Sequence, residues 1–219
     1  LRHVDADVVF LQEIQGERTI SKNRFDDWPN NNQFEFLADQ VWQHHAYGKN
    51  AIYKSGHHGN AILSKYPFIQ WENIDVSIMR SASRSLLHGT IQIPGIEQKV
   101  HIICVHLGLF ELERASQLAT LVKRIGSHVP ADEPLIIAGD FNDWRGRAER
   151  HLHHDLGVTE VFKTSHGSHA RTFPAALPVL SMDRIYCRGL DVINCKRLHG
   201  QPWNRLSDHT PLLAEFRLK

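Results

Sequence analysis

Polar residues of the types that bind metals and move protons stand at the boundaries of buried apolar segments. In chain order they are Glu13, Asn60, His106, Asp140, Asn142, Asp183, Asp208 and His209. Each of them precedes or follows a short run rich in Val, Ile and Leu. A polar group left unpaired beside such a run costs roughly 1 to 3 kcal/mol. Each residue therefore needs a partner or a function.

Taken together, these side chains suit the binding of a hard cation and the hydrolysis of a phosphate ester. Carboxylate and amide oxygens are the ligands that Mg²⁺ prefers, and histidines and carboxylates move protons. Asp140 and Asn142 stand two positions apart on an expected extended strand, so both side chains should point to one face. Taken singly, Asp208 or Asn60 is better explained as a cap, a turn former or a surface residue, but the whole set favours a site.

Short apolar, β-branched runs that recur along the chain predict the strands that position these residues. The expected strands are Asp7–Leu11, Ala61–Leu63, Leu86–Ile93, Val100–Leu107, Leu135–Ala138, Ile185–Cys187, Val192–Cys195 and Leu212–Phe216. Helical periodicity predicts helices over Phe34–His45 and Leu112–Ile125, and a shorter helix is expected over Arg147–Leu156. This pattern predicts a β-sandwich of mainly antiparallel sheets flanked by helices. Antiparallel pairing would bring the polar strand ends to one rim.

Composition excludes several other classes. The chain has 219 residues with no linker or repeat, which favours one compact domain, and no apolar run approaches the ~20 residues of a membrane span. Lys and Arg number 25 against 24 Asp and Glu, so net charge does not indicate a polyanionic partner. Three cysteines without a paired spacing favour a reducing compartment, and we expect a cytoplasmic location. The 16 histidines are mostly expected on the solvated surface.

Six short motifs in order resemble the endonuclease/exonuclease/phosphatase superfamily of metal-dependent phosphoesterases. They are Leu11-Gln12-Glu13, Gly59-Asn60-Ala61-Ile62-Leu63-Ser64, Val105-His106-Leu107, Gly139-Asp140-Phe141-Asn142, Met182-Asp183-Arg184-Ile185 and Ser207-Asp208-His209. The resemblance covers nearly the whole chain. It implies an α+β fold, a four-layer αββα sandwich of two mainly antiparallel mixed sheets flanked by helices, formed by 1–219 as a single domain. Only 12 residues precede Glu13, so an earlier family strand with a metal- or phosphate-contacting asparagine is expected to be missing from this stretch.

The resemblance also implies a role for each residue. Glu13 corresponds to the principal carboxylate ligand of Mg²⁺ or Mn²⁺, and Asp208 lies near the metal as a ligand or through water. Asp140 resembles the group that orients and deprotonates the attacking water, while Asn142 holds a phosphate oxygen or that water.

The histidines complete the implied site. His209 resembles the donor to the phosphoryl oxygen, and Asp183 would accept from its other ring nitrogen. His106 resembles a second histidine that assists the leaving group. Asn60 either buttresses the site or starts a strand after Gly59.

The expected activity is hydrolysis of a phosphodiester, with nucleic acid or a phospholipid-like ester as substrate and no obligate protein partner. His106-Leu107 favours the branch of deoxyribonucleases, sphingomyelinases and inositol-polyphosphate phosphatases over abasic-site endonucleases. A catalytically silent scaffold on the same fold is the alternative, although the retained acidic residues and histidines weigh against it. A serine hydrolase is excluded, because the sequence has no G-x-S-x-G motif.

Overall fold

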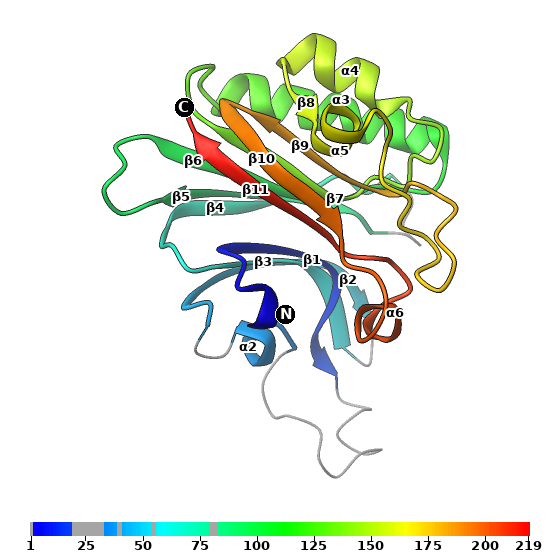
Figure 1. The fold of residues 1–219 in the computed structure, drawn as a ribbon. Helices are drawn as coiled ribbons and strands as arrows, with labels where there is room; N and C mark the ends of the chain where they lie inside the picture. Colours follow the sequence, from blue (N-terminus) through cyan, green and yellow to red (C-terminus); the bar gives the residue numbers. More distant parts are fainter. Residues whose placement is uncertain (1, 19–32, 39–40, 54–55, 79–82) are drawn as a thin grey trace. The chain divides into compact units, whose positions relative to one another are not determined.

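A computed structural model describes residues 2–18, 33–38, 41–53, 56–78 and 83–219 (Figure 1). The chain divides into two compact units, Leu1–His106 and Leu107–Lys219. The organisation of 1–219 as a single domain stays a prediction. Within the described residues, no helix has the length and apolar character needed to span a membrane.

The first unit contains two groups of antiparallel strands. Strands β1 (Val8–Arg18), β3 (Gly56–Ser64) and β2 (His44–Tyr53) form a sheet in the order β1-β3-β2. Strand β5 (Ser85–Gln92) pairs with β4 (Phe68–Asp75) and with β6 (Lys99–His106). A short 3-10 helix η1 (Arg2–Val4) precedes β1. The apolar residues of β5 and β6 are nearly all buried, which explains why these strands appear in the sequence as continuous apolar runs.

Helix α2 (Gln33–Ala38) covers part of the first sheet through its two buried residues, Phe34 and Ala38. The predicted helix over Phe34–His45 was therefore wrong in its second half. Trp42 is buried and its indole Nε1 donates to the Ala6 carbonyl at 2.8 Å. From His44 onward the chain pairs with β3, so strand pairing overrides the local helical pattern.

The second unit combines a small sheet, a hairpin and four helices. Strand β9 (Asp183–Arg188) lies between β7 (Leu135–Asp140) and β8 (Thr159–Glu160), antiparallel to both. The hairpin consists of β10 (Leu190–Arg197) and β11 (Leu212–Leu218). The helices are α3 (Glu111–His128), α4 (Ala148–Leu156), α5 (Val161–His166) and α6 (Trp203–Leu206). Helices α3 and α4 lie side by side (Figure 1).

Local sequence explains the boundaries of these helices. Leu118, Leu121 and Ile125 fall on one face of α3 and are buried. The side chain of Glu160 accepts from the Lys163 amide at 2.6 Å and caps the start of α5, which is followed directly by Gly167 with a φ of 76°. A residue without Cβ is favoured at that left-handed position. The predicted helices over Leu112–Ile125 and Arg147–Leu156 are confirmed to within a few residues.

Candidate active site

The turn after β7 holds Asp140 and Asn142 together. Asp140 is the last residue of β7 and is buried. The main-chain amide of Asn142 donates to Asp140 Oδ1 at 2.8 Å, and the side-chain Nδ2 donates to Oδ2 at 3.0 Å. Nδ2 also donates to the Leu107 carbonyl at 2.9 Å. Both oxygens of the Asp140 carboxylate are therefore held by one neighbouring residue.

The two side chains meet for a different reason from the predicted one. Alternation along an extended strand was expected to aim Asp140 and Asn142 at the same face, but β7 ends at Asp140. Asn142 has a φ of 50°, in the left-handed region that asparagine tolerates better than most residues. A tight turn, closed by the Asp140 carboxylate as acceptor, brings the pair into contact.

The register between β7 and β9 places Asp183 opposite Asp140. The two residues are direct partners in this antiparallel pair, with Asp140 at the end of β7 and Asp183 at the start of β9. Side chains of directly opposed residues lie on the same face of a sheet. Two carboxylates are thus brought to one sheet edge by backbone pairing alone.

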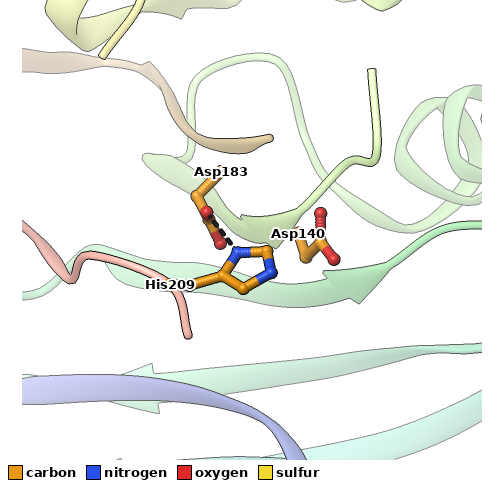
Figure 2. Close-up of side chains that lie close together, drawn as sticks. All are labelled: Asp140, Asp183 and His209. Atoms are coloured by element: carbon orange, nitrogen blue, oxygen red, sulfur yellow. Dashed lines mark hydrogen bonds and ion pairs between the residues drawn. The ribbon is translucent and has the colours of Figure 1, made fainter. Parts of the chain in front are cut away.

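His209 completes this cluster from the segment that precedes β11. Its Nδ1 forms a hydrogen bond to Asp183 Oδ2 at 2.8 Å, which is the contact that the sequence predicted. Figure 2 shows the imidazole lying between the two carboxylates, with Asp183 on one side and Asp140 on the other. One ligand-type atom from each of the three residues lies within 4.8 Å of the others. The Phe173 ring packs against the imidazole with a centroid separation of 5.0 Å.

The acidic neighbours of His209 favour its charged form. Partial burial by itself lowers the pKa of the imidazole. The hydrogen bond to Asp183, together with the charges of Asp183, Asp140 and Asp208, outweighs burial and raises the pKa from 6.5 to about 9. The carboxylates around His209 therefore favour its imidazolium form at neutral pH, with a proton on each ring nitrogen.

These contacts decide which residues suit a metal and which suit proton chemistry. Nδ1 of His209 is committed to Asp183, and a charged imidazole has no lone pair for a metal ion. The group Asp140, Asp183 and His209 therefore fits proton transfer and anion binding better than metal ligation. Asp208, beside His209, has an exposed side chain whose carboxylate oxygens are of the type that Mg²⁺ prefers.

The remaining predicted site residues lie in the first unit. Glu13 is exposed, with a φ of 55°, at a register irregularity of β1 between Leu11 and Ile14. It was expected after the end of a strand, but β1 continues to Arg18. His106 is buried and is the last residue of β6, one residue before the predicted end of this strand.

Asn60 is fully buried inside β3, which begins at Gly56, so of the two alternatives for Asn60 the strand start is wrong. Its Nδ2 donates to the Ser85 carbonyl at 3.0 Å. This bond joins β3 to the start of β5 and is consistent with a supporting role inside the first unit.

Sequence reasoning missed two further contributors to the cluster in the second unit, Leu107 and Thr172. The Leu107 carbonyl accepts from Asn142, and the Leu107 amide donates to the Asp140 carbonyl at 2.9 Å. Thr172 contacts the segments that carry Asp183 and His209. Neither has a sequence signal, because Leu107 acts through its main chain and Thr172 lies in an irregular loop.

The chain matches the Endonuclease/Exonuclease/phosphatase family over residues 1–209. It therefore belongs to this family, whose members generally hydrolyse phosphoester bonds. It is 44% identical over 218 residues to Uncharacterized protein YbhP of Escherichia coli (strain K12), covering 100% of this chain and 86% of that protein.

Solved structures with similar folds come from the same family. The human Nocturnin catalytic domain with bound sulfate has a TM-score of 0.77 at 18% identity, covering 100% of this chain and 83% of that one. TDP2 of D. rerio in complex with a single-strand DNA product has a TM-score of 0.73 at 22% identity, covering 99% and 88%. An endonuclease/exonuclease/phosphatase from Beutenbergia cavernae has a TM-score of 0.77 at 19% identity. The match covers 99% of this chain and 64% of that chain. The predicted family and fold class are confirmed.

Proposed function

We propose that this protein is a divalent-metal-dependent phosphoesterase that hydrolyses a phosphodiester by attack of water. The observation that supports this most strongly is the cluster of Asp140, Asp183 and His209, in which each charged group has a defined partner. Family membership supports the hydrolysis of a phosphoester bond. A nucleic acid or a phospholipid-like ester is the proposed substrate.

Asp140 is the proposed acceptor of the proton from the attacking water. Its carboxylate is acceptor-only when charged, and Asn142 fixes its orientation through both oxygens. An amide nitrogen carries two hydrogens, and those of Asn142 serve Leu107 and Asp140. The remaining amide oxygen can only accept, so of the two proposed roles of Asn142 the contact to water is favoured over the contact to phosphate.

His209 is the proposed donor to a non-bridging phosphate oxygen. Asp183 holds Nδ1, which leaves the opposite nitrogen, Nε2, to donate to the developing negative charge. Because Asp183 is fixed at the start of β9, the imidazole is oriented before substrate binds. No reorganisation is then needed when charge develops on the phosphate.

A divalent cation would neutralise charge on the phosphate in the transition state. Asp208 is the proposed carboxylate ligand in the second unit, directly or through water. Glu13 as principal ligand, His106 as helper of the leaving group and Asn60 as a supporting residue stay predictions from the sequence. Mg²⁺ commonly uses one or two carboxylates and several waters, which suits this donor set.

The test is an activity screen of the purified full-length protein after exhaustive chelation. Mg²⁺ or Mn²⁺ is added back, and plasmid DNA, RNA, phospholipids, inositol phosphates and a chromogenic phosphodiester are offered as substrates. We expect activity that EDTA abolishes and Mg²⁺ restores. Full turnover after chelation, with no response to added metal, would contradict metal dependence.

Two variants distinguish activity of this protein from activity of contaminating nucleases. His209→Ala should abolish the activity, whereas His154→Ala should leave it unchanged, because His154 is an exposed surface residue that pairs with Asp155 on α4. If a folded wild-type protein hydrolysed none of these substrates with any metal, the proposal would be wrong. The catalytically silent scaffold would then be the better explanation.

A further inference from the structure

Thr172 joins the segments that carry the two partners of the Asp183–His209 hydrogen bond. It lies in the loop between α5 and β9 and is fully buried, with 0% of its surface exposed. Its side chain and its main chain both form hydrogen bonds. The two sets of bonds reach different segments.

The side chain of Thr172 reaches the start of β9. Its Oγ1 accepts from the main-chain amide of Met182 and from that of Asp183, each at 3.2 Å. The Met182 carbonyl in turn accepts from the Phe141 amide at 3.0 Å, directly after Asp140. One hydroxyl therefore fixes the backbone from which the Asp183 carboxylate projects.

The main chain of the same loop reaches the segment that carries His209. The Thr172 carbonyl accepts from the Thr210 amide at 2.8 Å, and the Asp208 carbonyl accepts from the Ala175 amide at 2.7 Å. These two bonds hold the residues on either side of His209. The Thr172 amide donates to the Leu180 carbonyl at 2.8 Å and closes the loop on itself.

We propose that Thr172 is a positioning residue, which sets the separation of Asp183 and His209 through these contacts. This inference rests on the proposed function. Hydrogen bonds of this kind span roughly 2.7 to 3.2 Å, so lengthening the 2.8 Å bond by about half an ångström would carry it beyond that range and weaken it. Misplacement of a reacting group by about 1 Å can cost ~100-fold in rate.

Thr172→Val and Thr172→Ser separate the hydroxyl from the rest of the side chain. Val keeps the shape and removes the acceptor, which leaves the Met182 and Asp183 amides buried without their partner. Ser keeps the acceptor. We expect Thr172→Val to lower kcat by roughly 10- to 100-fold with KM nearly unchanged, and Thr172→Ser to restore most of it. Thr120→Val in α3, whose Oγ1 donates to the Ser116 carbonyl, is the matched control and should leave kcat unchanged.

The second measurement does not depend on activity. The Nδ1–H proton of His209, shared with Asp183, should give a low-field proton NMR signal in chelator-treated protein, identified by its absence in His209→Ala. We expect this signal in wild type and Thr172→Ser, and its loss in Thr172→Val. A purely structural role would lower the melting temperature of Thr172→Val without removing the signal below that temperature.

The two measurements distinguish the possible failures. If no phosphoesterase activity exists, the NMR signal still tests the role of Thr172. If a folded Thr172→Val keeps wild-type kcat and the low-field signal, the positioning role is refuted. If Thr172→Val does not fold, Thr172→Ala carries the test, since it also lacks the hydroxyl but places no methyl group against the two amides.

Discussion

The substitution Asp183→Asn should lower the pKa of His209 by a large and measurable amount. Asp183 Oδ2 lies 2.8 Å from His209 Nδ1, and burial alone lowers the pKa of this imidazole. The present value of about 9, against 6.5 for an unperturbed histidine, therefore depends on the surrounding carboxylates. With the Asp183 charge removed, we expect this pKa to fall by roughly 1 unit, because burial then opposes only the more distant Asp140 and Asp208.

The size of the effect of the Asp183 charge on the pKa of His209 can be checked against Coulomb's law. Two charges about 4 Å apart in a partly buried site interact by ~4 kcal/mol at an effective dielectric constant of ~20. A pKa moved from 6.5 to about 9 corresponds to ~3 kcal/mol. The side chains are 26% and 15% exposed, so water screens part of this attraction, and we expect an effective contribution of about 1 to 2 kcal/mol.

The assay is an NMR titration of the His209 ring proton in chelator-treated protein, so that no bound cation affects the result. Asp155→Asn is the matched control, since Asp155 pairs with His154 at 3.0 Å on the exposed surface of α4. It should leave the His209 titration unchanged. A wild-type pKa near 6.5, or the same pKa in wild type and Asp183→Asn, would refute the electrostatic argument.

Three further predictions follow from the same cluster. Asp140→Asn should reduce kcat by at least ~100-fold in a protein that still folds, since Asp140 acts on the attacking water; near wild-type turnover would exclude this role. In a double-mutant cycle, adding Asp183→Ala to His209→Ala should cost little further activity, whereas full additivity would show independent roles. Because the folded-state pKa of His209 is raised, its stabilising contribution is fully present below pH 6.5 and is lost as pH rises through about 9. Urea unfolding of wild type and Asp183→Asn should therefore differ most below pH 6.5 and converge above pH 9.

The buried strands and the residues at their ends could be predicted from sequence because burial leaves a clear pattern. Strands β5, β6 and β7 are almost entirely buried and appear as apolar runs. Strand β4 was missed, since most of its residues are exposed and it shows no regular alternation. The second half of the Phe34–His45 helix was predicted wrongly because His44 and His45 belong to β2, whose conformation is decided by pairing with β3, the next strand along the chain, rather than by local periodicity.

The candidate site was predictable as a set of residue types but not as a geometry. The meeting of Asp140 with Asn142 depends on a positive φ at Asn142, which the sequence permits but does not require. The position of Glu13 depends on a register irregularity inside β1. Thr172 escaped notice because its contribution lies in hydrogen bonds to the main chain of residues 182, 183 and 210.

The opposition of Asp140 and Asp183 explains why each needs its own partner. Like charges that face each other directly across two strands destabilise a sheet, and here β7 and β9 place two carboxylates in that relation. Asn142 supplies N–H donors to one carboxylate, and His209 supplies a cation to the other. The neutral amide leaves Asp140 with its full negative charge and its capacity to accept a proton, whereas the imidazolium neutralises Asp183. One sheet edge therefore carries a proposed base, Asp140, beside a proposed acid, His209. The difference arises because Asp140 is bonded to a neutral amide, whereas Asp183 is bonded to an imidazolium.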